Sequence, residues 1–204
     1  ISKGEWIVSL IKVKGSSITG ALAAVDGSAL TGISAGIQHA ELFRLSAQLT
    51  GEADPITGFV TTNGVDGQGR IGSGMSESSG VFTFPATGIY RIEFSAFYYR
   101  PQADNQVRIV IKDNASNELA KSIQSISDAN YYVHNYTSCM LDVTDVTANS
   151  NKVTFEFEDV GGTGGGTSAR LDGSTSYNST HVVFTRLGDT WLILNVIAEK
   201  TSAI

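Results

Sequence analysis

The sequence predicts an all-β protein, a sandwich or jelly roll assembled from many short strands. Three observations favour this class. Segments of alternating apolar and polar residues recur along the chain, glycine-rich turns such as Asp66-Gly67 and Asp172-Gly173 separate them, and no segment has a convincing amphipathic helical period. The 22 glycines against three prolines, with abundant Ser, Thr and Asn, also suit short strands joined by tight turns.

The predicted strands follow the alternating segments. In "NKVTFEFEDV", Val153, Phe155 and Phe157 share one side of the strand and polar residues take the other, as expected for a strand with one buried face. "GVFTF" and "GIYRIEFSAFYYR" are expected to pair with each other across a Pro-Ala-Thr-Gly break. The predicted strands are 42–49, 58–62, 80–84, 88–100, 105–113, 131–143, 151–160 and 180–187.

Composition limits the function classes. The chain has 204 residues, of which 41% are hydrophobic and 17% charged, enough for a core in one sizeable domain with appendages or in two small domains. The net charge of −6 and the lack of a Lys/Arg cluster argue against nucleic acid or an anionic membrane surface as the main partner. No apolar run is long enough to predict a membrane span.

Cysteine usage and the start of the chain bear on the compartment. Cys139 is the single cysteine, so packing or assembly replaces intrachain disulfides, and its strand setting predicts a buried, inert thiol. The first residues lack the uninterrupted apolar region and cleavage site of a signal peptide.

Residues 1–40 have a different texture and are predicted to form an N-terminal arm. Segment 5–14 alternates as a strand, and the Gly/Ser/Ala-rich stretch that follows contains two similar units, "SITGAL" and "SALTGI". This stretch is too small to bury a core alone, but identical copies could share an apolar seam; a flexible linker is the alternative. The candidate contacts in the arm are Trp6, Val8, Leu10, Ile18, Leu22, Leu30 and Ile33.

The chain ends in a second peripheral apolar segment, 189–204. As a strand it would place Trp191 and Ile193 on one face, and its mate would be the apolar segment near the N-terminus. Such segments are costly to expose, so we expect a neighbouring subunit to cover them. The predicted organisation is an arm over 1–40, a head over 41–188 and a tail over 189–204.

Catalytic and cofactor motifs give no site. Gly67-x-Gly69-x-x-Gly72 matches a dinucleotide fingerprint in letters only, because no helix follows it. Ser9-x-x-Lys12 lies on an alternating strand, where residues three apart point to opposite faces. We therefore expect no enzyme, no cofactor and no metal.

The histidines, acidic residues and tyrosines leave some alternatives open. His39, His134 and His181 lack metal-ligand spacing and are interpreted as partly buried or interface residues. Carboxylates at strand ends can hold calcium, although solvated strand ends are commoner. The aromatic runs 97–99 and 131–136 could form a sugar-stacking platform or, as we prefer, a mixture of core and subunit contacts. The acidic residues concerned are Asp142, Asp145 and Asp159.

The stretch "GVFTFPATGIYRIEF" resembles the signature of the complement C1q-like head, a jelly roll related to tumour necrosis factor. In that signature a Phe is followed after five residues by Gly-x-Tyr-x-Phe-x-aromatic, and this sequence departs from it at one position, Ile92, which stays apolar. "HVVFTRL" resembles the family's closing strand, with Phe184 in the core. The resemblance covers about residues 41–188 and implies a trimer. The signature residues are Phe82, Phe84, Gly88, Tyr90, Ile92, Phe94 and Phe184.

A narrower resemblance concerns bacteriophage virion proteins. "AVDGSALTGI" resembles a phrase of tail-fibre and related proteins, and segment 69–94 together with "FTRLGDT" is similar to C1q-type domains of marine bacteriophages. This resemblance implies a homotrimeric tail-fibre or knob component, assembled in the host cytoplasm and located in the virion. It would hold other virion proteins through the arm and bind a host-surface receptor or glycan. A capsid decoration protein and a non-viral C1q-like binding module remain the alternatives.

Overall fold

The computed structural model describes residues 36–190, except 66, 102–104, 127–129 and 161–168. This part of the chain is β-structure with one short 3-10 turn, η3. The strands are β1 (His39–Leu45), β2 (Leu49–Thr50), β3 (Phe59–Thr61), β4 (Ser76–Ser78), β5 (Val81–Thr83), β6 (Gly88–Arg100), β7 (Asn105–Asp113), β8 (Glu118–Ile126), β9 (Tyr131–Val143), β10 (Lys152–Val160), β11 (Arg170–Leu171) and β12 (His181–Gly188), and η3 is Asn149–Asn151.

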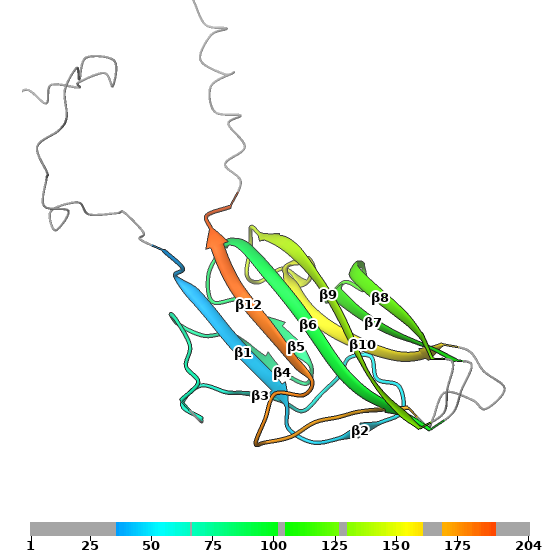
Figure 1. Cartoon of the computed structure of the whole chain (residues 1–204). Helices are drawn as coiled ribbons and strands as arrows, with labels where there is room; N and C mark the ends of the chain where they lie inside the picture. The colour runs from blue at the N-terminus through cyan, green and yellow to red at the C-terminus, as the bar shows by residue number, and fades with distance from the viewer. Residues whose placement is uncertain (1–35, 66, 102–104, 127–129, 161–168, 191–204) are drawn as a thin grey trace, which may run out of the picture. The chain divides into compact units, whose positions relative to one another are not determined.

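The first sheet has the long strand β6 near its centre. Its order is β2-β11-β6-β12-β1-β3, and β9 pairs with β6 along the whole of both strands. Every pairing is antiparallel, and β1 lies beside β12 although the two strands are far apart in the sequence. Figure 1 looks onto this sheet, with β1, β12, β6 and β9 running side by side.

The second sheet has the order β4-β5-β10-β7-β8, again antiparallel throughout. The two layers alternate along the chain, because β5 and β7 belong to the second sheet while β6 and β9 belong to the first. The predicted all-β jelly-roll class is therefore confirmed.

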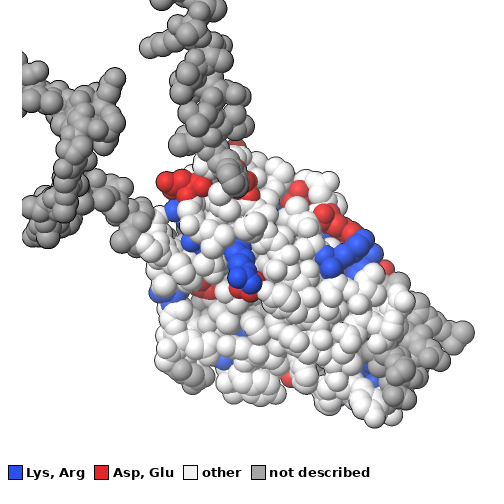
Figure 2. Space-filling model, turned by 45° about the horizontal axis from the view of Figure 1, so that its top comes forward, with Lys and Arg blue, Asp and Glu red and all other residues white. Residues whose placement is uncertain are grey.

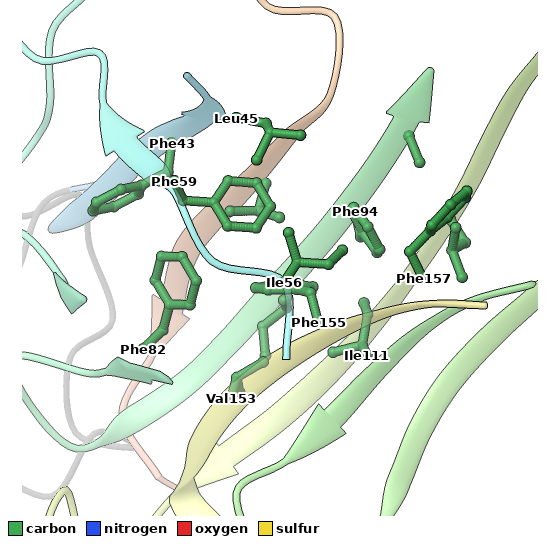
Figure 3. Close-up of a cluster of buried hydrophobic side chains, with 14 of the residues drawn as sticks. Phe43, Leu45, Ile56, Phe59, Phe82, Phe94, Ile111, Val153, Phe155 and Phe157 are labelled. Atoms are coloured by element: carbon green, nitrogen blue, oxygen red, sulfur yellow. The ribbon is translucent and has the colours of Figure 1, made fainter. Parts of the chain in front are cut away.

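The core lies between the inner faces of the two sheets and is rich in phenylalanine. The ring of Phe82 lies 5.2 Å from Phe43, 5.4 Å from Phe155 and 5.1 Å from Phe184, between ring centroids. These distances are typical of favourable aromatic pairs. Figure 3 shows how strands of both sheets contribute side chains to this cluster.

One predicted pairing is wrong. β5 pairs with β4 and β10 in the second sheet, whereas β6 belongs to the first, so the segments 80–84 and 88–100 do not form a hairpin. The four residues between β5 and β6, 84–87, carry the chain from one layer to the other. Alternation shows that a segment is a strand with one buried face, but it does not show which sheet the strand joins.

Gly88 begins β6 at the end of this crossing. Its φ of 146° lies where L side chains rarely occur. A Cβ here would lie 2.5 Å from Arg186 Nε and 2.6 Å from the carbonyl oxygen of Gly188. Glycine is therefore required both by the backbone conformation and by the close approach of β12.

Two further strands differ from the sequence expectation. β8 was not among the predicted strands, because "ELAKSIQSI" has a weak apolar alternation. The strand expected over 42–49 is β1, which begins at His39 and ends at Leu45. No helix in the described part of the chain is long and apolar enough to cross a membrane.

Candidate functional site

The outer face of the first sheet is the strongest candidate for a functional surface. We use "the outer face" for the residues of β3, β1, β12, β6 and β9 that point away from the core. The strand register aligns them in rows, one of which runs Val60, Arg44, His181, Ser95 and Tyr136. The described surface of these strands is mainly uncharged, as Figure 2 shows in an oblique view of this side.

Large apolar and aromatic side chains on the outer face are exposed to solvent. Met140 on β9 is the extreme case, with 72% of its surface exposed. Scattered apolar residues on a surface are normal, but a group of them on one sheet face marks an interaction site. The exposed members are Val60, Tyr132, Tyr136, Met140 and Leu187.

An aromatic cluster forms one end of the outer face. Phe97 and Tyr132 are stacked, with centroids 5.3 Å apart and planes inclined by 9°, and Tyr99 lies 5.0 Å from Tyr132. The guanidinium of Arg170 lies 4.3 Å above the Tyr99 ring. The Tyr99 hydroxyl donates a hydrogen bond of 2.6 Å to Asn130 Oδ1. These contacts hold the rings rigidly, which lowers the entropy cost of binding a partner.

The centre of the outer face is polar but carries little free charge. Tyr136 donates its hydroxyl to Glu93 Oε1 at 2.6 Å, and Arg91 contacts the same oxygen at 2.9 Å. Ser95 Oγ and His134 Nε2 lie 2.7 Å apart. Most polar groups here are thus satisfied within the sheet and can be covered at low cost.

Two neighbouring residues of this row have enclosed nitrogen atoms without such partners. Arg44 is buried, and its Nε and Nη1 atoms have no hydrogen-bond partner in the described residues. His181, directly opposite on β12, has a buried Nδ1 that is also unpartnered. Burial lowers the pKa of His181 from its usual value, so this ring is neutral near pH 7.

The outer face of the second sheet has the opposite character. Arg108 on β7 contacts Glu156 at 3.2 Å, Glu118 at 3.7 Å and also Glu158, and Lys112 lies 2.6 Å from Asp54. A shallow pocket of about 390 Å³ beside this ladder is lined largely by polar side chains, among them Lys112. Alternating charges of this kind are typical of a solvent-exposed surface.

Cys139 and the three histidines do not form a catalytic group. Cys139 pairs with Ile92 in register and packs against the core, whereas His134 and His181 point outward. Burial raises the pKa of Cys139 to about 11, so the thiol is neutral and unreactive. His39 points inward from β1, three strands away from β9.

The acidic residues considered for calcium have other roles. Asp145 Oδ1 accepts hydrogen bonds from the Thr147 backbone N–H and hydroxyl. Asp159 is buried in an ion pair with Arg100, so a solvated strand end is the wrong description for it. The described residues contain no group of three or more His, Cys, Asp or Glu side chains placed to hold a metal.

The signature residues lie in the core or at the crossing. Tyr90, Ile92 and Phe94 point inward from β6, and Phe84 packs on Tyr90 with centroids 4.4 Å apart. Phe82 and Phe184 are fully buried. The candidate arm and tail contacts lie outside the described residues; they are Trp6, Val8, Leu10, Ile18, Leu22, Leu30, Ile33, Trp191 and Ile193.

Three notable residues escaped the sequence reasoning. Glu41 is buried and accepts hydrogen bonds from the Met75 N–H at 2.7 Å and the Thr61 hydroxyl at 2.8 Å. Its alternation with Phe43 could have indicated an inward side chain. The burial of Arg44 and Arg100 has no local signal, because both depend on segments distant in sequence.

Comparison with solved structures supports the fold. Over 74% of this chain and 93% of the other, the structure is similar to an Eiger TNF from S. frugiperda, with a TM-score of 0.54 and 12% identity. Murine APRIL matches over 73% of this chain and 98% of its own, with a TM-score of 0.51 and 14% identity. No family model and no curated protein sequence matches the chain. The described part of the chain thus has a jelly roll of the tumour necrosis factor and C1q type, a fold compatible with a binding module.

Proposed function

We propose that the chain is a structural protein of a bacteriophage virion, the trimeric head of a tail-fibre or knob component that attaches by binding and not by catalysis. The observation that carries the binding role is the outer face of the first sheet. It is a mainly uncharged surface with exposed aromatic side chains, on a chain whose net charge is −6. For such a surface, contact with a protein partner is more favourable than contact with water.

The C1q-like signature supports a homotrimer, and the exposed apolar side chains of the outer face support assembly through that face. The second sheet carries the charged ladder, and its outer face would stay in contact with water. The outer face of the first sheet would form the subunit contacts. Loops at the ends of the sandwich would then be available for a host-surface receptor or glycan. The arm, residues 1–40, would join other virion proteins.

The virion role is tested by locating the protein in purified particles of a phage that encodes it. Antibody labelling seen by electron microscopy should mark the tail, and quantitative mass spectrometry should find a copy number divisible by three. Deleting residues 1–40 should abolish incorporation. Labelling spread over the capsid would instead establish the decoration role, and unlabelled particles would refute both.

A further inference from the structure

Arg44 is a buried cation for which the described chain supplies no counter-charge. Only 2% of its surface is exposed, and Nε and Nη1 are enclosed without a hydrogen-bond partner. Enclosing a guanidinium in this way costs several kcal/mol unless a carboxylate or other acceptor meets it. The isolated head is therefore incomplete at this position.

The neighbours of Arg44 on the outer face offer no anion. Its cross-strand partners are His181 on β12 and Val60 on β3. Since Nε and Nη1 are the enclosed atoms, Nη2 remains as the part of the guanidinium through which an incoming group can approach. That group has to come from outside the described fold.

Glu93 is a suitable carboxylate on the other half of the same face. It lies on β6, and its two hydrogen-bonding neighbours, Tyr136 and Arg91, both contact Oε1. Oε2 has no hydrogen-bond partner in the described residues, and a quarter of the side chain is exposed. Within one chain, β12 lies between β6 and β1, and Glu93 is opposite Val183 rather than in the row of Arg44.

Ring symmetry would bring these two halves together. In a closed trimer each interface is heterologous, so one side of the face contacts the other side of the next copy. The half formed by β3, β1 and β12 carries the unpaired cation, and the half formed by β6 and β9 carries the carboxylate with an unused oxygen. The cation of the first half and the unused carboxylate oxygen of the second are therefore complementary, although Glu93 also contacts Arg91 through its other oxygen.

We propose that Arg44 of one copy forms an ion pair with Glu93 of the neighbouring copy, closing the ring. The pair rests on the proposed trimer and deepens it by naming the contact that sets the orientation of the subunits. It explains why a buried arginine without an intrachain acceptor occupies a mainly uncharged face. Electrostatic matching of this kind favours one arrangement over others.

Charge-reversal substitutions at Arg44 and Glu93, made in the full chain, test the ion pair. Arg44→Glu and Glu93→Arg each place like charges across the interface, and each should weaken trimer assembly by about 30-fold or more. The double variant R44E/E93R should recover most of that loss, measured as the trimer dissociation constant by light scattering and sedimentation. A double variant that assembles no better than the singles would overturn the pair.

A double-mutant cycle with neutral substitutions tests the ion pair if the Arg44→Glu variant does not fold. Arg44→Met, Glu93→Gln and their combination should show coupled effects on the dissociation constant, whereas independent effects would contradict the pair. A monomeric wild-type chain would refute the trimer itself, a result distinct from a trimer that is indifferent to these substitutions.

A free anion is the competing partner for Arg44. Thermal unfolding of the wild type and of Arg44→Met can be followed across a phosphate series at constant ionic strength. The ion pair predicts that phosphate changes the two melting temperatures equally. Selective stabilisation of the wild type by phosphate would show that Arg44 holds a free anion and would overturn the proposal.

Discussion

Gly88 illustrates at the scale of a single residue how the sequence signature controls the fold. It begins β6 with a φ of 146° and faces Arg186 and the Gly188 carbonyl at a distance that leaves no room for a methyl group. The signature therefore demands glycine for the crossing between layers, whereas its aromatic positions demand bulk for the core.

Gly88→Ala should destabilise the head by about 2 kcal/mol, because it combines an unfavourable backbone conformation with a steric clash. Gly188→Ala is the matched control, since nothing lies within 4 Å of the point that an added Cβ would occupy there. Urea unfolding measures both. Equal stability of the two variants would contradict the role given to Gly88.

His39 is a second residue with a measurable consequence. Its ring is 3% exposed, with both nitrogens unpartnered, and burial lowers its pKa from the usual value near 6.5. As the pH falls, His39 therefore binds a proton in the unfolded chain at a pH at which it stays neutral in the folded chain. Stability is then greatest above about pH 6.5 and falls as pH decreases below it.

We expect the melting temperature to decline between about pH 6.5 and pH 5, and His39→Gln to make that decline shallower. His181, whose pKa burial also lowers, contributes part of the remaining decline. An unchanged slope in His39→Gln would show that other groups cause the acid sensitivity.

The sequence predicted the inward residues well and the buried charges poorly. Alternation places Tyr90, Phe94 and Phe155 in the core without further information, because one face of each strand must be apolar. Arg44 also obeys alternation by pointing outward. Its burial depends on neighbours from distant segments, which a local pattern does not report.

At the scale of the elements, β6 and β10 are joined by a buried ion pair at their ends. Arg100 is the last residue of β6 in the first sheet, and Asp159 lies near the end of β10 in the second. Both side chains are almost wholly enclosed. The pair thus crosses the sandwich, and its loss would leave a charge inside it.

Asp159→Asn should cost about 3–5 kcal/mol of unfolding free energy, the usual range when one partner of a buried pair is removed. The double variant Arg100→Met with Asp159→Met should lose less unfolding free energy, because neither buried charge remains. Chemical denaturation separates the cases. A single variant as stable as the wild type would mean that the pair is not enclosed in solution.

Strand existence was easier to predict than strand partnership. The segments 88–100 and 131–143 match β6 and β9 to the residue, yet the expected pairing of β5 with β6 is wrong. Periodicity also failed at β8, whose sequence mixes lysine, serine and alanine among few bulky residues. Sheet membership depends on the crossing connections, which the alternation of a single strand does not encode.

At the scale of the whole molecule, the two faces of the sandwich differ in chemistry. The second sheet exposes a ladder of paired charges, and the first exposes tyrosines, Val60 and Met140. The net charge of −6 keeps the chain soluble while the uncharged face is left for association. The aromatic runs 97–99 and 131–136 indicated part of the candidate site from the sequence, with Tyr98 in the core and Tyr132 and Tyr136 exposed. The whole site was not located, because its members come from five strands whose order only the fold reveals.

The central claim, that the outer face of the first sheet assembles three copies, is tested most directly by light scattering of the full chain at micromolar concentration. We predict a mass about three times the 21.6 kDa of one chain for the wild type and for the control Ile123→Lys, which changes an exposed apolar residue on the second sheet. Tyr136→Lys, on the outer face of the first sheet, should reduce the mass toward that of one chain. A monomeric wild type, or a trimer that Tyr136→Lys leaves intact while Ile123→Lys breaks it, would contradict the account.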